Sequence, residues 1–359
     1  MVGNFPPPVH GMAVINETVH NEIKKNGLIP EVINLSAPSL DRSLGERLKR
    51  LPRVLLGLWR LVTTRNAYGG MLYMSVSGGL GQVYEILFLL VARLLQMRVF
   101  LHHHAFAYLD NKNTLTQILV MAGGKNTTHV VLSPGMANLL QEKYQASRVI
   151  PISNSVFLAE KPKSVNQVRK TVRTVGFISN ISEDKGVFEF LDLMEAISEN
   201  NCDIGGRLAG PFQDEQTEQA VRSRLHSLPH VKYVGPQYGS DKEAFYRTID
   251  VLIFPTKYIN EAEPVTIHEA ISHSIPVIAY GRGCIPEIIG LDCGLVIDPV
   301  EPFAPKAADQ LQRWSSDASK FREVSNAASA RFAQSHDKNM GRREVLLNKI
   351  LNNGEGQEV

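Results

Sequence analysis

Short runs rich in β-branched and aromatic residues alternate with longer stretches of helical periodicity along nearly the whole chain of 359 residues. Such alternation is typical of βαβ units, which build parallel sheets covered by helices on both faces. The sequence therefore predicts an α/β fold with two doubly wound parallel sheets. The expected strands are residues 2–5, 32–35, 71–74, 98–102, 129–132 and 149–152 in a first series, then 172–178, 204–209, 231–234, 251–254, 276–279 and 295–297 in a second.

A polar stretch without a strand signal, AEKPKSVNQVRK (159–170), separates the two series and is typical of an interdomain linker. At about 100–200 residues per domain, the length also fits two domains. We predict a first domain over residues 1–157 and a second over residues 168–332.

The cysteines and the N-terminal residues indicate the cellular compartment of the protein. Cys202, Cys284 and Cys293 are odd in number and lack metal-ligand spacing, which disfavours a disulfide framework and favours a reducing compartment. MVGNFPPPVHG has neither a basic start nor an apolar stretch, so we expect no signal peptide. The expected location is the cytoplasm.

Basic residues are concentrated in the first half of the chain. Residues 1–160 hold 15 Lys+Arg against 9 Asp+Glu, and residues 161–359 hold 23 against 27, so the net charges are +6 and −4. Much of the excess lies in RSLGERLKRLPRVLLGLWRLVTTR (42–65), a composition typical of a helix on anionic lipid. This predicts a peripheral position on the inner face of the cell membrane. The alternative is a surface helix with leucines packed inward and arginines solvated, interrupted by Pro52 and Gly57.

The most apolar run of the chain is YEILFLLVARLLQMRVFLHHH (84–104). Arg93 and Arg98 leave its uncharged stretch far short of the ~18 residues that a membrane span needs. We predict a buried helix that leads into a strand.

Loops at the carboxyl ends of parallel strands are where such folds bind ligands. One of them is NEAEPVTIHEAISHSIPVIAYG (260–281), in which Pro264 suits the first position of a helix. The backbone N–H groups of Val265 and Thr266, with the positive end of the helix dipole, would then form an anion site suited to phosphate. Glu261 could reach a sugar hydroxyl beside that phosphate, and Glu269 could accept from both hydroxyls of a ribose. Periodicity alone gives a second interpretation, in which the residues 267, 270, 271 and 274 face inward and Glu269 is solvated.

The whole string resembles the E-x7-E region of retaining GT-B glycosyltransferases of the large group-one family (family 4-like), a type found in bacterial polysaccharide biosynthesis. The typical stretch there is E-G-x-P-x-x-x-x-E-A-x-x-x-G-x-P-V-I-A. Ser274 stands where the family usually has Gly. The resemblance implies two Rossmann-like domains with an interdomain cleft, and a C-terminal helix at about 333–352 that crosses back to the first domain. The matching positions are Glu261, Pro264, Glu269, Ala270, Pro276, Val277 and Ala279.

Other segments extend the resemblance over the second domain. GFISNISEDKGVFEFL resembles the family's G-R-L-x-x-x-K-G loop, whose Arg and Lys hold the donor diphosphate. Lys185 falls on the Lys position, whereas Asn180 falls on the Arg position and removes one fixed charge. RLAGP, which contains Gly210, resembles the Gly motif at a strand end. YVGPQ, which ends at Gln237, resembles the segment that reads the nucleotide base.

The first domain carries looser signals. FPPPVHGMAV resembles the family's P-P-x-G-G turn, in which Gly11 lets the backbone approach donor and acceptor. MVGNF supplies barely half of the first strand that the resemblance implies, which leaves open whether the natural start lies upstream.

FLHHHAFAY (100–108) ends a strand with three histidines. Neighbouring side chains on a strand point to opposite faces, so the run is not predicted to chelate a metal. A polar strand end that faces solvent is the simplest interpretation. In the resembling family a His at this position contacts the donor sugar, which makes His104 a candidate catalytic residue and His103 a candidate for lining the cleft.

Several classes of protein are disfavoured by absent motifs. No G-x-G-x-x-G follows a strand, GGKNTT lacks P-loop spacing, no G-x-S-x-G occurs, and no basic and aromatic platform for nucleic acid is present. The lack of D-x-D disfavours a metal-dependent transferase with a single nucleotide-binding domain.

The resemblance thus predicts a retaining glycosyltransferase that needs neither metal nor cofactor. The expected donor is a UDP-, GDP- or ADP-sugar, and the expected acceptor is a saccharide or a lipid-linked saccharide in surface polysaccharide synthesis. Lys185 and the amides of residues 265–266 would stabilise the leaving diphosphate. Two alternatives remain open, a nucleotide-sugar epimerase on the same fold and a non-catalytic sugar-nucleotide binder.

Overall fold

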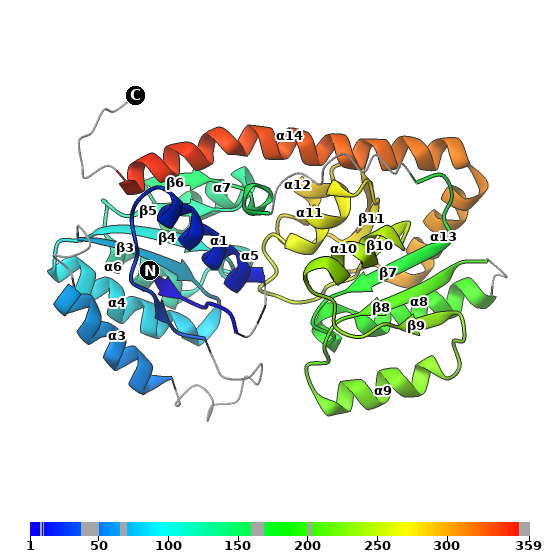
Figure 1. Ribbon diagram of the computed structural model, residues 1–359, viewed down its shortest axis with the longest axis horizontal. Coiled ribbons are helices and arrows are strands. Elements are labelled where there is room, and N and C mark those ends of the chain that lie inside the picture. The colour runs from blue at the N-terminus through cyan, green and yellow to red at the C-terminus, as the bar shows by residue number, and fades with distance from the viewer. Residues whose placement is uncertain are drawn as a thin grey trace. The chain divides into compact units, whose positions relative to one another are not determined.

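The computed structural model describes residues 1–7, 9, 11–36, 50–64, 70–158, 169–199 and 203–351. The chain forms two compact units (Figure 1). Unit 1 consists of Met1–Phe157 together with Asp337–Val359, and unit 2 is Leu158–His336. Most of the expected linker, Cys202, and residues 42–49 and 65 of the basic segment lie outside the described residues.

Each unit is built on a six-stranded sheet in which every pairing is parallel, as the alternation predicted. All of the predicted strands are present, with boundaries within two residues of those expected. In sheet order, unit 1 has β2 (Ile33–Asn34), β1 (Val2–Gly3), β3 (Met71–Val76), β4 (Arg98–His103), β5 (Thr128–Val131) and β6 (Arg148–Pro151). Unit 2 has β12 (Gly294–Ile297), β11 (Val277–Tyr280), β10 (Val251–Phe254), β7 (Thr174–Ile178), β8 (Gly205–Ala209) and β9 (Val231–Tyr233).

Both strand orders contain a point where the direction of winding reverses. The chain of unit 2 runs from β7 outward to β9 and then returns to β10 on the other side of β7. In unit 1 the same reversal separates β1 from β3. Loops leaving the two strands at such a point diverge to opposite faces and leave room for a ligand at the carboxyl edge.

Unit 2 is packed on both faces of its sheet, because alternate residues of each strand point to opposite sides. Val251 and Ile253 enter one core, whereas Leu252 and Phe254 enter the other. The first core lies under α8 (Val187–Glu199), α9 (Glu215–Leu225) and α13 (Phe303–Ser316). The second lies under α10 (Gly239–Arg247), α11 (Val265–Ser272), α12 (Ile285–Ile289) and residues 328–332 of α14 (Ala318–Leu351).

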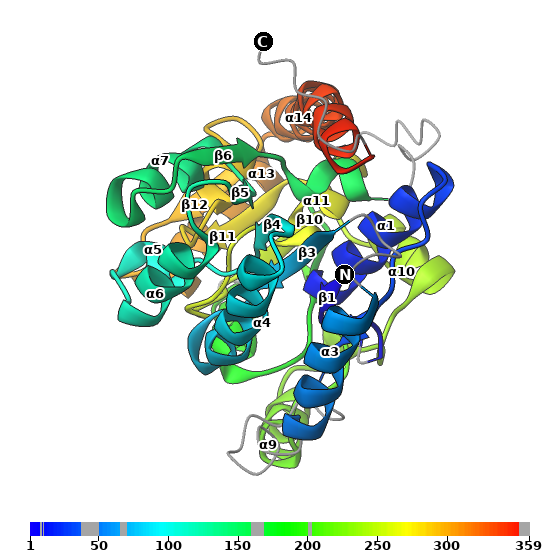
Figure 2. The same ribbon diagram turned by 90° about the vertical axis from the view of Figure 1, so that its left-hand side faces the viewer.

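Unit 1 carries α3 (Leu51–Thr64), α4 (Gln82–Leu94) and α6 (Thr114–Gly123) in a row on one face of its sheet (Figure 2). The opposite face is covered by α1 (Gly11–Lys25) and by residues 337–351 of α14. A short helix, α5 (Ala107–Asp110), follows β4, and α7 (Pro134–Tyr144) begins at the capping hydroxyl of Ser133.

The C-terminal helix, predicted at about 333–352, is the last part of the longer α14. Phe321 and Phe332 are buried in unit 2, and Leu346 and Ile350 are buried in unit 1. The side chain of Asn339 accepts a hydrogen bond from the Ser153 N–H at 3.2 Å. One helix therefore contributes to both cores.

The apolar run 84–104 forms α4 and β4, as predicted, but α4 is buried on one side only. Phe88 and Leu89 are buried, whereas Leu90 is 45% exposed and Leu94 is 82% exposed. The predicted burial holds for one side of α4 only, because the other side has no covering element among the described residues. Among these residues, none of the helices combines the length and the apolar character that a bilayer crossing requires.

The described part of the basic segment, α3, also differs from the alternative interpretation, an interrupted surface helix whose leucines pack inward. Pro52 lies in the first turn, where its missing N–H leaves no bond unmade, and Gly57 packs against Ile33 and Phe88 without interrupting the helix. Val54 and Leu61 face inward. The outward-facing apolar side chains of α3 are Leu51, Leu55, Leu56, Trp59 and Val62.

Candidate functional site

The winding reversal of unit 2 brings together the loops that follow β7 and β10. Ser182 caps the short helix η4 (Glu183–Lys185), and the Lys257 N–H donates to the Asp184 carbonyl at 2.8 Å. Gly186 has φ +84°, and a Cβ there would lie 2.1 Å from the Pro255 carbonyl oxygen. Only glycine lets the two loops approach so closely.

Lys185 and Glu261, one from each loop, form an ion pair. Nζ of Lys185 lies 2.5 Å from Oε2 of Glu261, and their side chains are 21% and 12% exposed. Thr256 donates its hydroxyl to the same oxygen at 3.3 Å. The ammonium also lies 4.6 Å from the centre of the Tyr258 ring. The structure therefore places these two predicted residues in direct contact, half-buried at the carboxyl edge of the sheet.

The helix that follows Glu261 begins one residue later than expected. Pro264 is the N-cap of α11, with an extended ψ of 120°, and the first helical residue is Val265. The N–H groups of Val265 and Thr266 donate to none of the described residues. They form the expected set of available donors at the positive end of the helix.

A buried pair stabilises the loop between Glu261 and the helix. Nε2 of His268 lies 3.1 Å from Oε1 of Glu263, and their side chains are 1% and 4% exposed. Sequence reasoning did not single out either residue. Helix periodicity alone gave no signal for them, because the contact depends on the loop folding back over α11.

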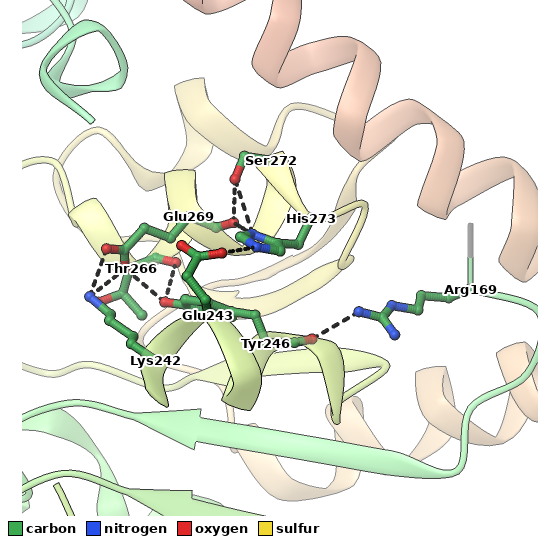
Figure 3. Close-up of polar contacts among 8 residues, drawn as sticks. All are labelled: Arg169, Lys242, Glu243, Tyr246, Thr266, Glu269, Ser272 and His273. Atoms are coloured by element: carbon green, nitrogen blue, oxygen red, sulfur yellow. Dashed lines mark hydrogen bonds and ion pairs between the residues drawn. The ribbon is translucent and has the colours of Figure 1, made fainter. Parts of the chain in front are cut away.

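Glu269 lies in a network between α10 and α11 rather than in solvent (Figure 3). Nζ of Lys242 lies 2.7 Å from Oε1 and 2.6 Å from Oε2, and the Tyr246 hydroxyl donates to Oε2 at 2.7 Å. His273 stacks on the Tyr246 ring with centroids 5.2 Å apart. The second interpretation, a solvated Glu269, does not hold, because α10 packs over the side chain and reduces its exposure to 20%.

The backbone conformation and the close contacts at position 210 require glycine. Gly210 has φ +131°, and a Cβ there would lie 1.7 Å from the Ser179 carbonyl oxygen, next to Asn180. Asn180 is half-buried. Gln237, also half-buried, donates to the Val234 carbonyl at 2.9 Å. These residues follow β7, β8 and β9, so they share the sheet edge with Lys185.

The three predicted residues of unit 1 have different surroundings. His103 is fully buried, with Nδ1 2.9 Å from the Tyr108 hydroxyl and Nε2 3.0 Å from Nδ1 of His129. Both ring nitrogens are occupied, so the prediction that His103 lines a ligand site does not fit its geometry. His104 is half-buried at the end of β4. Gly11 opens α1, and a Cβ there would meet no atom within 4 Å.

Burial also sets the protonation of this histidine group. It lowers the pKa of His102 and His103 well below the usual 6.5, and it lowers the pKa of His129 to about 4. The rings are therefore neutral near pH 7. Among the described residues, no three or more His, Cys, Asp or Glu side chains are grouped so that they could hold a metal ion.

Comparison with known families identifies the segment that contains this site. Residues 159–331 match the family described as glycosyl transferases group 1. A search of curated protein sequences finds no match.

Solved structures resemble the chain over nearly its full length. HepE of Anabaena, in complex with UDP, is 15% identical, covers 96% of this chain and 98% of its own, and has a TM-score of 0.69. Sucrose-phosphate synthase from Thermosynechococcus elongatus is 17% identical, with coverages of 97% and 99% and a TM-score of 0.67. WaaG, a glycosyltransferase involved in lipopolysaccharide biosynthesis, is 14% identical, with coverages of 98% each and a TM-score of 0.62. At these identities the likeness concerns the fold, and the fold expected from sequence is confirmed.

Proposed function

Because residues 159–331 belong to the group 1 glycosyl transferases, we propose that this protein transfers a sugar from a nucleoside-diphosphate sugar to a hydroxyl acceptor. The observation that carries the proposal is the contact between Lys185 and Glu261 beside the N-terminus of α11. A cation, available N–H groups and a carboxylate are the groups needed by a diphosphate with a sugar attached to it.

We propose that Lys185 separates from Glu261 when the donor binds. The diphosphate then accepts hydrogen bonds from the ammonium of Lys185 and from the N–H groups of Val265 and Thr266. Glu261 then accepts hydrogen bonds from the sugar hydroxyls and orients the anomeric carbon. As the bond to the sugar breaks, negative charge builds on the leaving oxygen, and the same donors stabilise it without metal or cofactor.

Retention of configuration is part of the proposal. The acceptor hydroxyl attacks on the face from which the diphosphate leaves, and the leaving phosphate takes the acceptor's proton. No protein nucleophile is needed for that step. His104 is proposed to contact the donor sugar, and Gly11 to let backbone approach the substrates. Asn180 leaves Lys185 as the side-chain cation of the β7 loop that meets the diphosphate.

For the nucleotide of the donor and for the acceptor we propose chemical classes. HepE has been solved with UDP and with UDP-glucose, which supports a nucleotide sugar, and UDP-, GDP- and ADP-sugars are the candidates. WaaG acts in lipopolysaccharide biosynthesis, which supports a saccharide or lipid-linked acceptor in surface polysaccharide synthesis. The cytoplasm is the proposed location.

The helical face of unit 1 supports a peripheral membrane position. On α3, α4 and α6 the charged residues are Arg53, Arg60, Arg93 and Glu85, and the single acid, Glu85, is buried. A face with exposed apolar side chains and arginines fits an anionic lipid surface. The exposed apolar residues on α4 and α6 are Val83, Leu87, Leu90, Leu94, Ile118 and Met121, in addition to those on α3.

Vesicle flotation tests the membrane proposal. The protein should float with vesicles that contain phosphatidylglycerol, less so at high salt, and not with neutral phosphatidylcholine vesicles. Leu55→Ser with Trp59→Ser should reduce flotation, whereas Leu291→Ser, which changes a fully exposed apolar residue of unit 2, should not. Equal flotation of both variants, or none by the unchanged protein, would contradict the proposal.

A thermal-shift panel of UDP-, GDP- and ADP-sugars tests the donor, because a bound ligand raises the melting temperature. Transfer from the stabilising donor is then measured for Glu261→Ala. If that variant folds and transfers sugar normally, the site assignment is wrong. An epimerase would convert the donor without acceptor, and a non-catalytic binder would be stabilised without either reaction.

A further inference from the structure

Two side chains of α10 hold the carboxylate of Glu269 from one side. Lys242 contacts both carboxylate oxygens, and Tyr246 donates to Oε2 (Figure 3). Tyr246 is 1% exposed, and burial raises its pKa well above 10. The phenol therefore stays protonated at neutral pH and donates its hydrogen to Glu269.

We propose that Tyr246 and Lys242 are positioning residues, which set the Glu269 carboxylate to receive the ribose hydroxyls of the donor. This inference rests on the proposed function. A carboxylate has about four acceptor positions, and the contacts from α10 leave part of them for the two hydroxyls of a ribose.

The spacing within α10 makes this arrangement possible. Lys242 and Tyr246 are four residues apart and therefore lie on one side of the helix, facing the same carboxylate. Side chains of α10 thus fix a functional group that α11 carries, as a precise binding site requires.

Further contacts hold both the backbone and the ring of Tyr246. Arg169 donates to the carbonyls of Tyr246 at 2.8 Å and Arg247 at 3.3 Å, at the end of α10. His273 stacks on the ring, and its Nε2 lies 2.7 Å from the Glu243 carboxylate. Its Nδ1 lies 2.8 Å from the Glu269 carbonyl oxygen. Because these contacts restrict the Tyr246 ring and the end of α10, little ordering of them is left to oppose binding.

Calorimetric titration with nucleotides that differ at the ribose tests the inference without an acceptor. UDP, GDP and ADP are titrated first, and the tightest binder is compared with its 2′-deoxy form. The unchanged protein should bind the 2′-deoxy form about tenfold more weakly, the loss of one good hydrogen bond. Tyr246→Phe and Lys242→Met should each weaken binding of the ribonucleotide about three- to tenfold. They should weaken the 2′-deoxy form by a smaller factor, because it keeps only the 3′-hydroxyl contact with Glu269.

Matched variants separate positioning from general loss of stability. Tyr280→Phe removes another buried phenol, which donates to the Glu301 carbonyl, and Lys306→Met removes a surface partner of Glu301. Both should bind the two nucleotide forms like the unchanged protein. If Tyr246→Phe and Lys242→Met weaken both forms equally, the positioning role is refuted while the proposed function stands. If the unchanged protein binds none of the nucleotides, the proposed function itself fails.

Discussion

Glu261→Gln is expected to tighten binding of a nucleoside diphosphate while it impairs sugar transfer. In the structure the ammonium of Lys185 is already paired with Glu261 at 2.5 Å. A diphosphate without a sugar gains nothing from Glu261 and must compete with it for Lys185. Removing the negative charge of Glu261 therefore frees the lysine for the diphosphate.

The size of the effect follows from the burial of the pair. Exposed ion pairs contribute about 0.2–1 kcal/mol, and breaking a buried pair costs about 3–5 kcal/mol. With side chains 21% and 12% exposed, this pair falls between, at about 1–2 kcal/mol. Since 1.4 kcal/mol is a factor of ten, the dissociation constant for UDP should fall about 5- to 30-fold. Transfer should fall about 100-fold, because Glu261 no longer orients the sugar.

Calorimetric titration of UDP at low and high salt measures the change. GDP or ADP replaces UDP if the thermal-shift panel selects it. Lys185→Met should weaken binding and reduce its salt dependence, the opposite of Glu261→Gln. Glu301→Gln, which removes the surface partner of Lys306, should change neither. The reasoning is refuted if Glu261→Gln weakens diphosphate binding, or if Lys185→Met leaves it unchanged.

Three further predictions concern stability. Ser274 has φ +59° where glycine is favoured, so Ser274→Gly should stabilise unit 2 by about 0.5–1 kcal/mol and raise its melting temperature by about 1–4 °C. Gly210→Ala should destabilise the protein by more than about 2 kcal/mol in urea unfolding, because its Cβ would lie 1.7 Å from the Ser179 carbonyl oxygen at φ +131°. Acid should weaken unit 1, because burial lowers the pKa of His129 from 6.5 to about 4. Below pH 6.5 His129 is protonated in the unfolded chain but stays neutral in the folded chain. Full stability is therefore present above pH 6.5, and about 3 kcal/mol is lost as the pH falls toward 4. His129→Gln should lose less stability over that range, and equal pH dependence of both proteins would contradict this account.

The strands and the loops at their ends were predictable because β-branched runs and helical periodicity are local signals. Lys185 and Glu261 are 76 residues apart, and only the register of a resembling family indicated that both belong to one site. Their direct pairing depends on the close approach of the loops after β7 and β10, which Gly186 allows. No local sequence pattern predicts that approach. The periodicity interpretation of Glu269 as solvated failed for a related reason, since helix periodicity describes one helix and not the neighbour that covers it.

Burial in unit 1 was misjudged in both directions. His103 was expected near a ligand, but α5 and β5 supply the groups that occupy its ring. The apolar run that forms α4 was expected inside, but one side of it is exposed. Both errors arise because the hydrophobicity of a residue gives only its tendency to be buried. Its actual exposure depends on which helices and strands from elsewhere in the chain pack against it.

The path of α14 sets the order in which the protein can be completed during synthesis. Unit 1 begins with Met1 but obtains Leu346 and Ile350 for its core only from the last helix. Unit 2 is contained within a continuous stretch that ends at His336. A ribosome therefore releases everything unit 2 needs before it releases the final piece of unit 1. The half of the molecule that is made first is the half that finishes folding last.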